Sequence, residues 1–94
     1  TLTKFEKYTD PLTDLVIYAH QLPQREAELV TVLPMANHYL VVYEDGYMAT
    51  VNEQLEVIHQ SEYMQDLPIR AAYKVAGNVI ALVTPIRIGY LVSD

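Results

Sequence analysis

Three histidines are the side chains of this chain best suited to acid–base or metal chemistry. They lie far apart in the sequence, at His20, His38 and His59, whereas a local metal site places two ligands within a few residues of each other. Alternation along a strand would place Ser61 on the same face as His59, but no partner that could orient a histidine base is evident beside them. We therefore expect no metal site and no catalytic triad, and we interpret the histidines as partly exposed strand residues.

Other groups that often serve catalysis are missing or poorly placed. Glu44 and Asp45 form a carboxylate pair, but they fall in a predicted turn where water screens both charges. The three glycines are isolated in the sequence, which argues against a glycine-rich phosphate loop, and the absence of cysteine excludes thiol chemistry and disulfides. The expectation is a protein without enzymatic activity and without a cofactor.

Tyrosine is the outlier of the composition, with eight residues in 94 beside one phenylalanine and no tryptophan. It is common at binding surfaces and is also an ordinary cross-strand residue. Tyr39 and Tyr43, joined by Met48 across a predicted hairpin, would form an aromatic face. Two interpretations stay open: this face binds a partner, or it packs beneath another layer of the protein.

The charge of the chain is unevenly distributed around a formal net value of −6. Residues 26–66 contain acids and no lysine or arginine, whereas the basic residues lie before and after this stretch. Such a surface repels nucleic acid and anionic membranes over most of its area and attracts a basic partner. We therefore expect a protein partner, and neither nucleic acid nor membrane.

The elements that would position these groups are mainly β-strands. Asp45-Gly46 separates two apolar runs and predicts a hairpin with a two-residue turn. That turn pairs Val42 with Ala49 and Leu40 with Val51, whose shared face would be the core. A second hairpin at Gly77-Asn78 pairs Val75 with Ile80 and Tyr73 with Leu82, with Arg70 and Lys74 on the wet side of their strand.

The fold class that follows is mainly β. It is an antiparallel meander of about six to seven strands over residues 28–92. The predicted strands cover residues 28–33, 39–43, 47–51, 55–59, 69–75, 79–84 and 86–92.

The N-terminal third allows two interpretations. Asp10-Pro11 followed by apolar residues at helical spacing, up to Pro23, predicts a helix over 11–21, which would make the fold α+β. The run from Leu15 to Tyr18 is nevertheless as apolar and β-branched as the later strands, which favours a strand.

A weak repeat relates the two hairpin regions. Residues 28–43 resemble the stretch that starts at Ile69, with Asn37 and Asn78 in corresponding positions, 41 residues apart. Propeller blades repeat at about this period. The repeat indicates either two consecutive meanders or a two-blade protomer that closes a ring by oligomerising.

The bulk composition sets the frame for these elements. A chain of 94 residues with 51% hydrophobic residues is expected to form a single domain over 1–94. Its apolar runs are much shorter than a membrane span, and the lack of cysteine fits a reducing compartment, so we expect a cytoplasmic protein.

Three functional hypotheses follow. The leading one is a non-catalytic protein-interaction module, an inhibitor or adaptor, that presents an acidic, tyrosine-bearing surface to a basic site on a partner. Its candidate contact residues are Tyr39, Tyr43, Glu44, Asp45, Tyr47, Met48, Glu53 and Glu56. The second is a self-assembling subunit in which the acidic stretch of one copy meets Arg70, Lys74 and Arg87 of another. The third is a small-ligand binder or minor enzyme that uses His38, His59 and nearby carboxylates.

Overall fold

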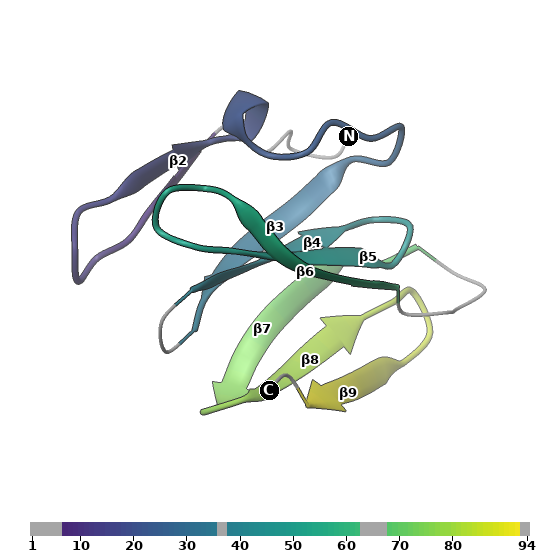
Figure 1. Ribbon diagram of the computed structural model, residues 1–94. Coiled ribbons are helices and arrows are strands. Elements are labelled where there is room, and N and C mark those ends of the chain that lie inside the picture. The colour runs from purple at the N-terminus through teal and green to yellow at the C-terminus, as the bar shows by residue number, and fades with distance from the viewer. Residues whose placement is uncertain (1–6, 36–37, 63–67, 93–94) are drawn as a thin grey trace.

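Three antiparallel sheets are stacked in the computed structural model, which describes residues 7–35, 38–62 and 68–92. A two-stranded sheet, a four-stranded sheet and a three-stranded sheet follow one another along the chain and from top to bottom in Figure 1. The prediction of a mainly β fold is confirmed. The strands are β1 (Lys7–Thr9), β2 (Val16–Tyr18), β3 (Leu29–Pro34), β4 (Tyr39–Tyr43), β5 (Tyr47–Val51), β6 (Val57–Glu62), β7 (Ala71–Ala76), β8 (Val79–Val83) and β9 (Ile88–Val92).

The predicted meander is divided between two of these sheets. Strands β3, β4, β5 and β6 form the middle sheet in sequence order, and β7, β8 and β9 form the lower sheet. The repeat in the sequence corresponds to this division, because β3–β4 and β7–β8 are the first two strands of each sheet. The structure thus contains two consecutive meanders packed face to face.

The middle sheet is the centre of the molecule, and every residue of β4 and β5 is buried. One of its faces packs Tyr39, Val41 and Ala49 against Ile17 and Leu22 of the N-terminal layer. The other packs Leu40, Val42 and Met48 against the lower sheet, which contributes Ile69, Ala72, Ile80 and Leu82. The hairpin therefore supplies core residues on both faces.

The first hairpin differs from the prediction by one residue of register. Its loop has three residues, Glu44–Gly46, and Gly46 adopts a left-handed φ of 96° while its N–H donates to the Tyr43 carbonyl. Glycine in that conformation is what a three-residue hairpin loop requires. Val41 consequently pairs with Ala49 and Val42 with Met48, so the predicted pairs of Val42 with Ala49 and Leu40 with Val51 were wrong.

The second hairpin contains a bulge that the prediction missed. Ala76 pairs with Val79 next to the turn, but the register shifts at Val75, and Tyr73 then pairs with Ala81 instead of Leu82. The predicted Val75–Ile80 and Tyr73–Leu82 pairs were therefore wrong. A bulge inserts one extra residue and changes the face on which the later side chains lie.

The predicted helix over 11–21 is absent, and the strand alternative describes this region. The Asp10 carboxylate accepts a hydrogen bond from the Leu12 N–H at 2.8 Å, which forms an Asx turn, and Asp14 has a left-handed φ of 61°. The hydrogen bond of Asp10 would also suit a helix start, because N-cap aspartates accept from the second or third following N–H. The left-handed φ of Asp14 is the feature that prevents a helix from continuing. The chain continues as β2 and then as one short 3₁₀ turn, η1 (Ala19–Gln21). A helix that could cross a membrane does not occur in the described part of the chain.

The apolar core between the middle and lower sheets predicts where truncation of a side chain will lower stability. Leu82 is 0% exposed between the middle and lower sheets. We expect Leu82→Ala to lower the free energy of unfolding by about 2–5 kcal/mol, because it removes buried methyl groups and leaves a cavity. Leu12→Ala is the control: Leu12 is 90% exposed, and its truncation should change stability by less than about 0.5 kcal/mol. Urea unfolding measures both, and equal effects would contradict this account of the core.

Candidate functional site

The tyrosines of the predicted binding patch are buried. Tyr39, Tyr43 and Tyr47 are between 2% and 7% exposed, and Met48 is also buried. The Tyr39 hydroxyl donates to the Asp10 carboxylate at 2.7 Å, and the Tyr43 hydroxyl donates to the Pro23 carbonyl. Of the two interpretations left open by the sequence, packing beneath another layer is the one observed. These residues are not available as anchors for a partner.

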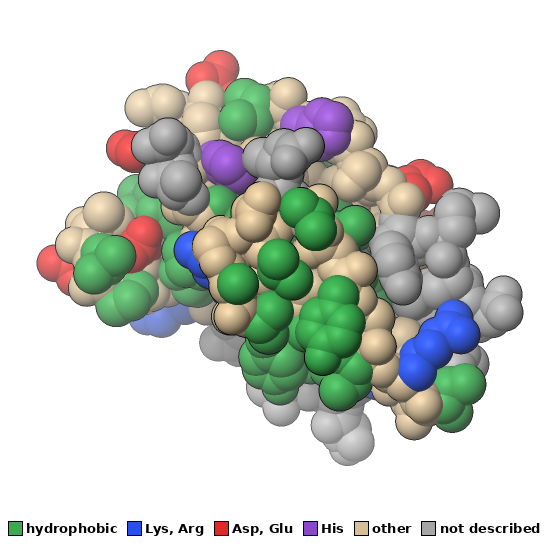
Figure 2. Space-filling model, turned by 90° about the horizontal axis from the view of Figure 1, so that it is seen from below, with side chains coloured by type: hydrophobic (Ala, Val, Ile, Leu, Met, Phe, Trp, Pro, Cys, Tyr) green, Lys and Arg blue, Asp and Glu red, His purple; other side chains and the backbone are tan. Residues whose placement is uncertain are grey.

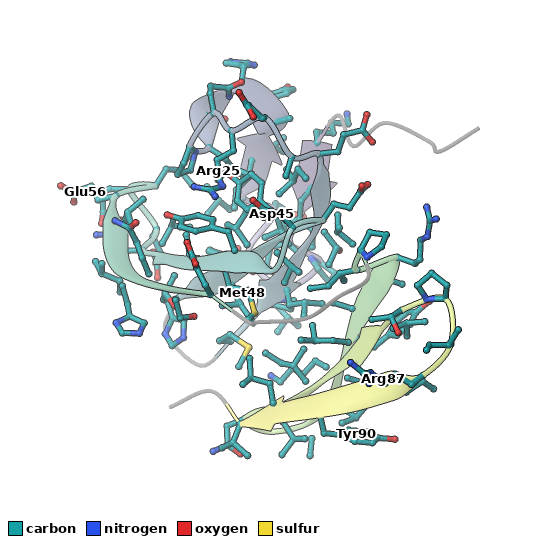
Figure 3. The ribbon with its side chains drawn as sticks, turned by 90° about the vertical axis from the view of Figure 1, so that its right-hand side faces the viewer. Arg25, Asp45, Met48, Glu56, Arg87 and Tyr90 are labelled. Carbon is teal, nitrogen blue, oxygen red and sulfur yellow. The ribbon has the colours of Figure 1, made fainter. Side chains whose placement is uncertain are left out.

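The acids of the predicted patch lie at opposite ends of the hairpin. Glu44 and Asp45 belong to the β4–β5 loop, whereas Glu53 and Glu56 belong to the β5–β6 loop. The five residues of β5 separate the two loops by roughly 15 Å at the usual strand rise. Figure 3 shows Glu56 far from Asp45. The four acids therefore do not form one continuous patch.

Asp45 is also engaged within the molecule. The Arg25 guanidinium lies 3.0 Å from its carboxylate and 3.8 Å from the centre of the Tyr47 ring, as Figure 3 shows for the charged pair. Burial opposes ionisation of Asp45, but hydrogen bonds from the Tyr47 N–H and from Arg25 outweigh it and lower its pKa. This carboxylate is partly neutralised before any partner arrives.

A surface that the sequence did not predict lies on the lower sheet. The register aligns Tyr73, Ala81 and Tyr90 in one row and Ala71, Val83 and Ile88 in the next, with Val79 and Val92 beyond them. We call these eight residues the outer face. No charged side chain belongs to it, and it forms the apolar area at the centre of Figure 2.

The outer face is strongly exposed for an apolar surface. Tyr73, Ile88, Tyr90 and Val92 are between 56% and 67% exposed, although contiguous apolar patches are uncommon on proteins that act alone. Alternation in β7 did indicate two different faces, but it could not show which of them meets the core. Ala72 faces the core. The side bearing Tyr73 faces solvent, although the wet side was predicted to be the one bearing Arg70 and Lys74.

The three basic residues predicted for oligomer contacts belong to the strands of the lower sheet or lie next to them. Lys74 pairs with Ile80 and therefore lies in the row that faces the middle sheet, not on the outer face. Arg70, Lys74 and Arg87 are all exposed, and residues 68–92 contain no aspartate or glutamate. Figure 3 places Arg87 and Tyr90 on the same sheet. The lower sheet thus combines an apolar surface with purely basic neighbours.

Two of the three histidines converge in a groove between the middle and lower sheets. The groove has a volume of about 610 Å³ and is lined by His38, Leu40, Met48, Thr50, Ile58, His59, Ser61, Leu91 and Val92. His59 and Ser61 do share a face, as alternation indicated. His20 lies elsewhere, stacked on Tyr18 at 5.6 Å.

Among the described residues, the groove lacks the groups that the small-ligand hypothesis requires. No carboxylate of this part of the chain is among its lining residues. Within residues 7–35, 38–62 and 68–92, no three histidine or acidic side chains gather as metal ligands. The convergence of His38 and His59 alone gives no general acid–base pair with an orienting partner.

The buried Asp10–Tyr39 hydrogen bond leads us to expect that folding stability depends on pH. It is the main reason that the pKa of Asp10 is lowered from its ordinary value of 3.8. A carboxyl with a lowered folded-state pKa stabilises the fold above its unfolded pKa, and this contribution is lost as the pH falls through the folded value. We expect Asp10→Asn to be less stable than the parent at pH 7, with the difference shrinking below about pH 4. Urea unfolding across this range tests it, with the exposed Asp14→Asn as control; a difference that does not change with pH would contradict it.

Comparison with known proteins finds no matching family model, no similar curated protein and no similar solved structure. Function must therefore be inferred from the surfaces of the chain itself. The outer face of β7–β9 is an exposed apolar surface, and such surfaces often mark interaction sites.

Proposed function

We propose that this chain is a non-catalytic protein-interaction module that binds a second copy of itself through the outer face of the lower sheet. The observation that carries the proposal is the exposure of Tyr73, Ile88, Tyr90 and Val92 on one uncharged sheet face. Burying such side chains removes apolar surface from water and favours association. Tyrosine adds a rigid ring with a polar tip that suits an interface.

The stacking of the sheets supports another β-sheet as the partner surface. Asn37 and Asn78 are 41 residues apart. With the same shift in sequence number, Leu40 and Val42 of β4 correspond to Ala81 and Val83 of β8. In the middle sheet, the face with Leu40 and Val42 is covered by the next sheet. The face with Ala81 and Val83 is the outer face, which is the corresponding position for a further sheet. Blades of β-propellers are antiparallel meanders that stack in this way.

Charge supports a second copy as the source of that sheet. Residues 68–92 carry Arg70, Lys74 and Arg87 without an acid, whereas residues 26–62 carry acids without lysine or arginine. A head-to-tail contact would bring the basic lower sheet of one copy to the acids of the next. Both faces of the middle sheet are covered, so these acids would be met at the β4–β5 and β5–β6 loops and at β6. Such a heterologous contact closes a ring or extends a filament, depending on its rotation. A ring would correspond to the propeller-like protomer considered from the sequence.

The acidic, tyrosine-anchored version of the interaction module is less well supported. Its tyrosines belong to the core, its acids lie at two ends of the hairpin, and Asp45 is paired with Arg25. The acids keep a role in the proposal as the electrostatic counterpart of the basic sheet. The absence of catalysis and the cytoplasmic location stay predictions.

The proposal predicts that association depends on Tyr90. Sedimentation velocity over increasing protein concentration should show oligomers for the parent chain. Tyr90→Lys should weaken self-association at least about tenfold, since it removes buried aromatic area and adds a like charge to a basic face. Leu12→Lys adds the same charge at an exposed side chain of the N-terminal layer and should associate as the parent does. A parent chain that stays monomeric at every concentration would overturn the proposal.

Salt provides an independent test of the charge argument. Light scattering at low and high ionic strength should show weaker association at high salt, because exposed opposite charges are screened. Apolar burial should preserve part of the association. Association that strengthens with salt would contradict the assignment of the acidic half as the opposing surface.

A further inference from the structure

The lower sheet has an open edge along β9. In the described part of the chain, β9 pairs with β8 and with no other strand, and its sheet has three strands where the middle sheet has four. In Figure 1, β9 lies at the edge of its sheet, below β6. An open strand edge presents backbone N–H and C=O groups that can pair with another strand.

Hydrogen bonding identifies the residues that face this edge. The Val83 carbonyl accepts from the Arg70 N–H at 2.7 Å, so the backbone groups of Val83 point toward β7 and not toward β9. The Val83–Ile88 pair is therefore a non-hydrogen-bonded pair, and such pairs alternate along an antiparallel ladder. By this alternation, Ile88, Tyr90 and Val92 direct their backbone groups to the open edge.

The groove with His38 and His59 lies beside the same edge. Thr50 pairs with His59 and Met48 with Ser61, so these side chains share the face of the middle sheet that covers the lower sheet. Leu91 and Val92 of β9 form the opposite wall. Figure 3 shows Met48 between the two sheets. All residues of β6 are exposed, and on the side of His59 and Ser61 no described strand of the lower sheet covers β6.

One polar atom at the groove has no partner among the described residues. His38 Nε2 is buried and makes no hydrogen bond with residues 7–35, 38–62 or 68–92, although His38 lines the groove. A buried ring nitrogen without a partner costs free energy. A polar side chain of a bound segment that reached this nitrogen would supply the missing hydrogen bond.

We propose that the β9 edge and this groove together bind an extended segment of a partner protein as a fourth strand of the lower sheet. Its backbone pairs with Ile88, Tyr90 and Val92. Alternate side chains of the segment enter the groove beside Gly89 and Leu91, where His38, His59 and Ser61 favour hydroxyl or amide groups. The intervening side chains extend the outer face and are apolar. Strand addition of this kind takes affinity from the backbone and specificity from alternate side chains.

The test uses a soluble peptide that alternates valine and threonine over seven residues between terminal lysines. It is titrated into the full chain, at a concentration where the chain alone is monomeric, and followed by NMR. We expect the amide protons of Ile88, Tyr90 and Val92 to exchange more slowly with solvent when the peptide is bound, and the ring signals of His38 to shift. A peptide that binds without slowing these amides, or that does not bind, overturns the proposal.

A matched pair of variants separates the backbone contribution from that of the side chain. Tyr90→Pro and Tyr90→Ala both lose the ring, but only proline loses the edge N–H, and proline is tolerated on edge strands. We expect the proline variant to bind the peptide about fivefold more weakly than the alanine variant, which is the effect of one lost hydrogen bond. Equal binding overturns strand addition. Because both variants lose the same side chain, this difference does not depend on self-association through the outer face.

A second pair tests the groove without changing β9. Ser61→Tyr would fill the groove and is expected to reduce peptide binding at least about tenfold, whereas Glu62→Tyr places the same ring at the next residue, on the other face of β6. Chemical-shift dispersion reports whether each variant is folded. Equal affinities for two folded variants would show that the peptide does not enter the groove and would overturn this part of the proposal.

Discussion

The burial of one β-hairpin on both of its faces is the constraint on which the rest of this structure depends. An antiparallel hairpin usually keeps one face in water, but β4 and β5 have no exposed residue. Such a hairpin can be stable only between two other layers. The N-terminal strands and the lower sheet supply these layers, and the chain therefore folds as a stack.

Tyrosine hydroxyls determine how the upper layer meets the hairpin. A buried hydroxyl needs a hydrogen-bond partner, and Tyr39 and Tyr43 find theirs in Asp10 and in the Pro23 carbonyl. These two partners flank the segment 11–21, which was predicted to be helical, one on each side of it. A helix over 11–21 would leave the layer without Ile17 as a buried strand residue. The unusual tyrosine content is thus explained first by packing.

The two ends of the stack are not equivalent, and this difference directs both functional proposals to the lower sheet. Its inner face is covered by the middle sheet, whereas its outer face is apolar and exposed. It is also one strand narrower than the sheet it packs on. The outer face and the β9 edge are therefore two separate candidate binding surfaces, one formed by side chains and one by backbone. A third candidate, the acidic surface, loses its aromatic anchors to the core.

The sequence alone determined the strand content, most strand positions and both hairpins, because alternation and turn residues act locally. It did not determine register, since Gly46 allows a three-residue loop as well as a two-residue turn, and a bulge at Val75 leaves no local signal. It also could not show which face of a strand is buried. Both faces of β4 are apolar, and in β7 the face that packs on the middle sheet bears Ala72 and Lys74, whereas the face bearing Tyr73 is exposed. Only the tertiary structure decides this, because burial depends on which layers lie above and below. The same limit explains why the histidines that converge, the tyrosines that are buried and the apolar face that remains exposed were not distinguished from sequence.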